Sequence, residues 1–99
     1  MSDQFPEPLT HAQLTETPAD QRAGLVEAYL LASIRAMLPQ AGTVDASSRL
    51  ADLAIDSLQI VELKFGLDQA LGQEVDIELI IGNPSIGGLA SESVRAAGL

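Results

Sequence analysis

The stretch LADLAIDSLQIVELKF, residues 50–65, decides how this sequence is interpreted. Asp56 is a residue type that caps helices, so a helix is expected to begin at Ser57. The Ser57 hydroxyl would then be exposed at the helix start, beside backbone N–H groups that no helical carbonyl can satisfy. A phosphate on that hydroxyl would lie at the positive end of the helix dipole. The Asp-Ser-Leu triplet alone is a weak signal, because ordinary helix capping also produces it.

The helix that starts at Ser57 is predicted to run to Leu71 and to end at Gly72. Helical spacing gives it one broad apolar face, which consists of Ile60, Leu63, Leu67 and Leu71. This face is predicted to point into the core. Its expected partners from the neighbouring helices are Val26, Leu30, Ile34 and Leu89.

The same helix carries a second, narrower apolar stripe, which consists of Leu58, Val61 and Phe65. Because it points nearly opposite to the broad face, a single core cannot bury both, and we expect the stripe to be at least partly exposed. The polar residues beside it are Glu62, Asp68, Gln59 and Gln69. An apolar strip with an acidic rim is typical of a docking site for basic partner proteins. The alternative is that the stripe, Leu58 above all, packs beneath the preceding loop through Leu53 or Ile55.

The rest of the chain adds three helices. Helix 1 of the bundle is predicted to have Thr17 as its N-cap and to stop before Pro39. The apolar residues within 75–81 could form a strand, but their place between helices favours a short turn of helix, which would be helix 3. Helix 4 is capped by Ser85 after a turn at Asn83-Pro84. Val44, Leu50, Leu53 and Ile55 are spaced to pin the long connection 39–55 onto the core. The fold class is therefore all-α, a four-helix bundle with a long loop between helices 1 and 2 and a short third helix.

Two prolines and few apolar residues predict a flexible tail over residues 1–16, which leaves 17–99 as the single domain. The balance of 5 basic to 14 acidic residues, a net charge of −9, excludes nucleic acid and argues against anionic membranes. The chain lacks cysteine, so thiolate metal sites and disulfides are impossible. It also lacks an apolar run of the ~20 residues that a membrane span needs, and a signal peptide; we expect a cytoplasmic monomer.

Around Ser57 the sequence resembles the acyl carrier proteins, especially those of modular polyketide synthases. The shared pieces are Leu50, Leu53, Ile55, Asp56-Ser57-Leu58, Val61-Glu62-Leu63, Pro84-Ser85-Ile86 and Leu89-Ala90. The resemblance covers roughly residues 20–97. Ala54 departs from it, since the family usually has glycine there, and this affects only the shape of the loop.

The resemblance implies a bundle of acyl-carrier type in which Ser57, flanked by Asp56 and Leu58, carries covalent 4′-phosphopantetheine. A phosphopantetheinyl transferase would move this arm from coenzyme A to the hydroxyl, and the thiol of the arm would hold acyl groups as thioesters. The implied partners are an acyltransferase, a ketosynthase and other synthase enzymes, which would contact Leu58, Val61, Glu62 and Phe65.

Other interpretations are a peptidyl carrier of a nonribosomal synthetase, which usually has a glycine-glycine-x-serine signature, and an acidic helical interaction module that is never modified. A catalytic role for Ser57 lacks support, because the single histidine, His11, lies in the predicted tail and Lys64 is seven residues further along the helix. Asp52 and Asp56 do not form a calcium-binding pattern, so no metal site is predicted. The protein is thus expected to be a carrier on which enzymes act, without catalytic residues of its own.

Overall fold

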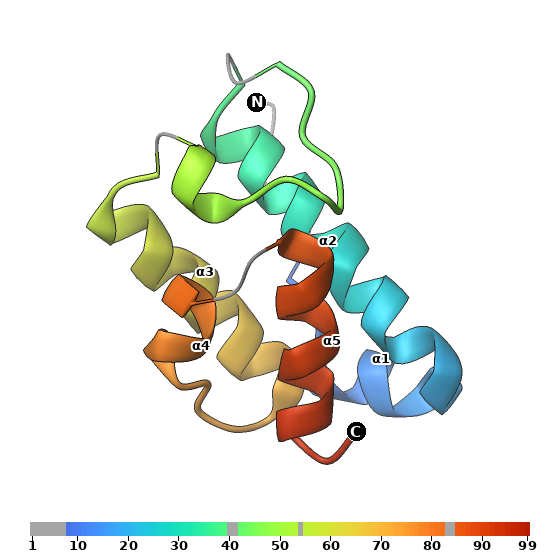
Figure 1. The fold of residues 1–99 in the computed structure, drawn as a ribbon. Coiled ribbons are helices and arrows are strands. Elements are labelled where there is room, and N and C mark those ends of the chain that lie inside the picture. The colour runs from blue at the N-terminus through green and yellow to red at the C-terminus, as the bar shows by residue number, and fades with distance from the viewer. Residues whose placement is uncertain (1–7, 40–41, 54, 83–84) are drawn as a thin grey trace, which may run out of the picture.

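The computed structural model describes residues 8–39, 42–53, 55–82 and 85–99 of the chain. In these residues the secondary structure is entirely helical, which confirms the all-α prediction. The elements in chain order are α1 (His11–Glu16), the 3₁₀ turn η1 (Ala19–Gln21), α2 (Arg22–Met37), the 3₁₀ turn η2 (Leu50–Asp52), α3 (Ser57–Leu71), α4 (Ile77–Gly82) and α5 (Ile86–Ala96) (Figure 1). The predicted turn at Asn83-Pro84 and the departure at Ala54 lie outside the described residues.

Helices α2 and α5 lie side by side and share the largest helix–helix interface, while α3 and the short α4 complete the predicted bundle (Figure 1). The core is aliphatic, and the largest side chains that it buries almost completely include Leu14, Leu30, Ile34, Leu63, Leu67, Ile80, Ile86 and Leu89. The predicted broad face of α3 is confirmed, because Leu63, Leu67 and Leu71 are buried and Ile60 packs against them.

The prediction of a flexible tail through residue 16 is wrong for residues 8–16, and residues 1–7 lie outside the described residues. Helix α1 begins with a capping box, in which Gln13 N donates to Thr10 Oγ1 and Thr10 N donates to Gln13 Oε1. Leu9 and Leu14, which flank this cap, are both buried in the core. An apolar pair at these positions is a hydrophobic staple, which fixes how the chain enters the helix.

The expected N-cap at Thr17 is also wrong. The Thr17 hydroxyl donates instead to the carbonyl of Gln13 at 2.8 Å and ends α1. The chain passes through η1, and α2 starts at Arg22. The Arg22 guanidinium then binds the carbonyl oxygens of Leu14, Thr15, Thr17 and Leu99 at 2.9–3.1 Å, so α1 is fastened to α2 and to the end of the chain.

The long loop is pinned to the core as predicted. Val44 and Leu50 are buried, while Leu53 and Ile55 pack against the core from its edge. Arg35 donates to the carbonyl of Val44 at 2.6 Å. At the other side of the loop, the first N–H groups of α5 donate to the carbonyls of Ser48 and Ala46, both at 2.9 Å. The loop therefore satisfies helix-end donors that would otherwise lack partners.

Candidate functional site

Ser57 is the first residue of α3, and its position is set by a local capping box. Gln59 N donates to Asp56 Oδ1 at 2.8 Å, and Asp56 N donates to Gln59 Oε1 at 3.1 Å. These reciprocal bonds fix the chain direction just before Ser57 and occupy the Asp56 carboxylate. The prediction that Asp56 caps this helix is confirmed.

The Ser57 side chain is exposed, and its hydroxyl makes no hydrogen bond to any other described residue. The backbone N–H groups of Ser57 and Leu58 likewise find no acceptor in that part of the chain. A hydroxyl with no competing partner is open to modification. A phosphodiester on it would lie beside two free N–H donors at the positive end of a 15-residue helix, so the site fits a phosphate-linked group.

The apolar stripe of α3 is exposed at both ends. Leu58 is 68% exposed and Phe65 is 61% exposed, whereas Val61 between them is partly buried. We call Leu58, Val61 and Phe65 the α3 ridge. Glu62, beside the ridge, is exposed. The exposure of Leu58 does not agree with the alternative in which this residue packs beneath the loop.

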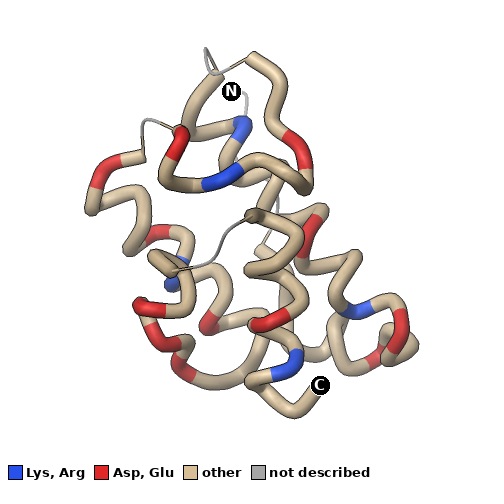
Figure 2. The backbone as a smooth tube through the Cα atoms, viewed as in Figure 1, with Lys and Arg blue, Asp and Glu red and all other residues tan. Residues whose placement is uncertain are grey.

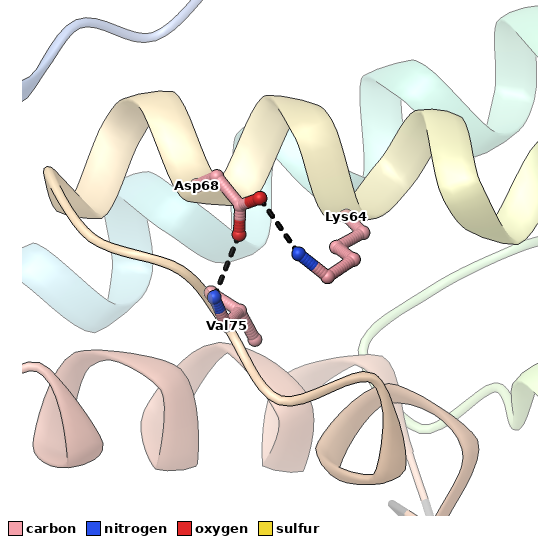
Figure 3. A network of polar contacts seen from close by, with 3 residues as sticks. All are labelled: Lys64, Asp68 and Val75. Atoms are coloured by element: carbon pink, nitrogen blue, oxygen red, sulfur yellow. Dashed lines mark hydrogen bonds and ion pairs between the residues drawn. The ribbon is translucent and has the colours of Figure 1, made fainter.

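Acidic residues follow one another closely along α4 and the segment that precedes it (Figure 2). They are Glu74, Asp76 and Glu78. Lys64 is the single basic residue of α3, and its Nζ donates a hydrogen bond to Asp68 Oδ2 at 2.8 Å. The other oxygen of Asp68 accepts the N–H of Val75 at 2.7 Å, so Asp68 joins α3 to the α3–α4 connection (Figure 3).

The ion pair changes the acid–base behaviour of Lys64. The hydrogen bond to Asp68 raises the pKa of the Lys64 amine above its usual value of 10.5; partial burial opposes this, and the charges of Asp68, Glu74 and Asp76 add to it. Lys64 is therefore a charged ammonium at neutral pH.

His11 lies at the opposite end of α3 from Ser57. Its Nδ1 is 3.3 Å from the carbonyl oxygen of Ala70, thirteen residues beyond Ser57 and therefore about 20 Å along the helix axis. A histidine at that distance cannot take the proton from the serine hydroxyl. Within the described residues no cluster of three or more His, Asp or Glu side chains could hold a metal ion, and no helix is long and apolar enough to cross a membrane.

Comparison with known proteins agrees with this geometry. The family described as "Phosphopantetheine attachment site" matches residues 28–92, so the chain belongs to that family of carrier domains, whose members bear covalent 4′-phosphopantetheine. The chain is also similar to the phenolphthiocerol/phthiocerol polyketide synthases of Mycobacterium tuberculosis and Mycobacterium bovis. In each species one polypeptide of the synthase is 32% identical to it over 80 residues, which cover 81% of this chain and 4% of the synthase polypeptide. No solved structure matches the chain significantly.

Proposed function

We propose that the chain is an acyl carrier in which 4′-phosphopantetheine is attached to Ser57 and which serves a polyketide-type pathway. The observation that carries this proposal is the exposed Ser57 hydroxyl at the capped start of α3, which makes no hydrogen bond to another described residue. Its place within the family match and the similarity to a polyketide synthase support the proposal. The chain is then a substrate of partner enzymes and acts as a monomer.

Each part of the site has a separate task. When bound, the arm supplies a thiol that holds an acyl group as a thioester. Asp56 and Gln59 keep the first turn rigid, so that Ser57 presents its hydroxyl to the transferase in one orientation. The N–H groups of Ser57 and Leu58 stabilise the negative charge of the phosphodiester after attachment.

The α3 ridge is the proposed contact for the transferase, the acyltransferase and the ketosynthase. It starts one residue after Ser57, so a partner bound to Leu58 and Phe65 is held beside the attachment point. Glu62 adds a negative rim that attracts enzymes with basic surfaces and orients their approach. The net charge of −9 acts in the same sense over a longer range.

The decisive experiment is a mass measurement of the chain after incubation with coenzyme A and a phosphopantetheinyl transferase. The unaltered chain should gain the mass of one arm, and Ser57→Ala should fold normally and gain none. Ser47→Ala, which removes another exposed hydroxyl, is the matched control and should be loaded fully. If Ser57→Ala still gains the arm, the assignment of Ser57 as the attachment site is wrong. If the unaltered chain gains nothing, an interaction module that is never modified is the better interpretation.

A further inference from the structure

Lys64 is the single lysine of a chain that contains no cysteine, so it is the one side chain with an amine or thiol nucleophile. It is seven residues after Ser57, which places both residues on the same side of α3, about 10 Å apart along the axis. An extended 4′-phosphopantetheine chain on Ser57 is longer than these two helical turns. An acyl group at its end therefore comes within reach of the Lys64 amine.

The surroundings of Lys64 leave room for such an encounter. An open hollow of about 450 Å³ lies between α3 and the α3–α4 connection, and its walls are formed by Lys64, Glu74, Val75, Asp76 and Ile77. The Lys64 side chain is 19% exposed, so the amine is neither sealed in the core nor surrounded only by water. Steric exclusion alone does not protect this amine from an acyl group.

What opposes the reaction is charge. The carboxylates of Asp68, Glu74 and Asp76 all attract the single Lys64 ammonium, and Asp68 also accepts a hydrogen bond from it at 2.8 Å. All three raise the pKa of Lys64, and an ammonium has no lone pair with which to attack a carbonyl. The Val75 N–H fixes the Asp68 carboxylate in place from the other side (Figure 3).

We infer that Asp68 is a positioning residue that keeps Lys64 as an unreactive ammonium and so prevents the carrier from acylating itself. The inference rests on the proposed function, because the arm on Ser57 supplies the acyl group. In the reaction that is prevented, the neutral Nζ attacks the thioester carbonyl, a C–N bond forms and the C–S bond breaks. The departing thiolate takes the proton that the nitrogen loses, which leaves an amide on Lys64 and a free thiol.

The first test does not depend on the arm. The unmodified chain is incubated with a small acyl thioester of N-acetylcysteamine between pH 7 and pH 10, and acylation of Lys64 is measured by peptide mass spectrometry against acylation of the α-amino terminus. Asp68→Asn, whose amide oxygen can still accept the Val75 N–H, should acylate Lys64 about two- to fivefold faster, the range expected for loss of a partly exposed ion pair. Asp68→Glu should restore slow acylation, and Lys64→Arg should abolish the signal.

Glu62→Gln is the matched control, since it removes one negative charge from the same helix outside the group that acts on Lys64. Equal Lys64 acylation rates in Asp68→Asn, in Glu62→Gln and in the unaltered chain would overturn the inference. If Asp68→Asn does not fold, the unaltered chain is compared in buffer and in urea. The native chain should then acylate Lys64 only at higher pH than the unfolded chain, and coincident pH profiles would overturn the inference.

The second test uses the loaded carrier. Acyl-loaded unaltered and Asp68→Asn chains are aged, the thioester is cleaved with hydroxylamine, and the acyl mass that remains on Lys64 is measured. More residual acylation is expected in Asp68→Asn, and equal amounts would count against a protective role. Failure to load Ser57 at all would contradict the proposed function but would leave the result of the first test intact.

Discussion

The ring of Tyr29 in α2 packs directly against Gly66 in α3. A Cβ atom added at Gly66 would lie 3.1 Å from both Cε2 and Cζ of that ring, closer than ordinary van der Waals contact, and it would also collide with the hydroxyl oxygen. A side chain at position 66 would therefore push the two helices apart or displace Tyr29. Glycine at this position leaves room for the Tyr29 ring between α2 and α3, although glycine is a poor helix former.

This contact predicts different effects for two glycine-to-alanine changes in helices. Gly24 in α2 has no atom within 4 Å of an added Cβ, so Gly24→Ala should stabilise the fold by roughly 0.5–1 kcal/mol through helix propensity. Gly66→Ala should gain less or destabilise, because Tyr29 must move. Urea unfolding measures both, and Gly66→Ala should be better tolerated in a Tyr29→Phe background. Equal gains at the two sites would mean that Tyr29 moves without cost.

The second prediction concerns α1, which lies in the stretch that the sequence pattern indicates as a flexible tail. Leu14 is fully buried, so Leu14→Ala should lower the free energy of unfolding by about 2–5 kcal/mol, as truncations of buried leucine do. Leu58→Ala is the matched control, and because that side chain is 68% exposed it should change the free energy by less than about 0.5 kcal/mol. Similar small effects of both substitutions in urea unfolding would show that α1 is not part of the stable core.

The elements that could be predicted from sequence are those determined by nearby residues. Asp56 and Gln59 close a capping box within four residues, and Gly72 ends α3 with a positive φ of 71°. Both boundaries therefore follow from local residue types. The start of α1 is just as local, because Thr10 and Gln13 form a capping box flanked by Leu9 and Leu14. That pattern is readable in the sequence, but the nearby prolines indicate a tail more strongly.

Features that depend on distant segments could not be predicted. Nothing near Arg22 in the sequence indicates that it binds the carbonyl of Leu99. The position of Ser57 follows from its own helix, whereas the charge environment of Lys64 requires Glu74 and Asp76 to fold back beside α3. Sequence reasoning therefore identifies the proposed attachment serine but misses the ion pair two turns away.

The third prediction concerns Ser93, a buried hydroxyl in α5. Ser93 is 1% exposed, and its Oγ has no hydrogen-bond partner among the described residues. A buried polar atom without a partner loses its hydration and gains nothing in return. Ser93→Ala should therefore leave the free energy of unfolding unchanged or raise it by about 1 kcal/mol.

Ser85, which caps the same helix, provides the matched control for Ser93. Its hydroxyl accepts the N–H of Gly88 at 3.0 Å as the N-cap of α5, so Ser85→Ala should cost about 1 kcal/mol. Thermal or urea unfolding should thus show a loss of stability for Ser85→Ala and none for Ser93→Ala. A substantial loss of stability in Ser93→Ala would show that its hydroxyl has a partner, such as an ordered water molecule.

The fourth prediction is a pH dependence in the long loop. The Asp45 carboxylate accepts hydrogen bonds from the hydroxyl and the N–H of Ser47, at 2.6 and 3.0 Å, and these lower the pKa of Asp45 below its usual 3.8. A group whose pKa is lower in the folded state stabilises the fold above the unfolded value and loses this effect as the pH falls through the folded value.

The unaltered chain should therefore be more stable than Asp45→Ala at neutral pH, and the difference should shrink below about pH 3.8. Urea midpoints measured at several pH values test this. Ser47→Ala, which removes the hydroxyl donor but keeps the carboxylate, should show a weaker pH dependence than the unaltered chain. A difference between the unaltered chain and Asp45→Ala that stays constant far below the usual carboxylate pKa would contradict the assignment.

The last prediction concerns the α3 ridge. Phe65 is 61% exposed and Glu62 is exposed, so Phe65→Ser and Glu62→Lys should leave the unfolding midpoint nearly unchanged. Both should slow the transfer of the arm to Ser57, because the first removes an apolar contact and the second reverses a charge that attracts the transferase. The measurement is the time course of loading by intact mass. Val61→Asp is a poorer probe, since Val61 is partly buried.

Two control variants separate docking from general surface effects. Ile81→Ser removes an equally exposed apolar side chain, 62% exposed, from α4, and Glu92→Lys reverses an exposed charge on α5. If the ridge is the contact surface, both controls should load at the rate of the unaltered chain, because neither residue lies on the part of α3 that follows Ser57. The charge effect should also weaken with added salt, whereas the Phe65→Ser effect should persist, since salt screens charges and not apolar contacts. Loading of all four variants at the unaltered rate would leave the ridge without a role in docking.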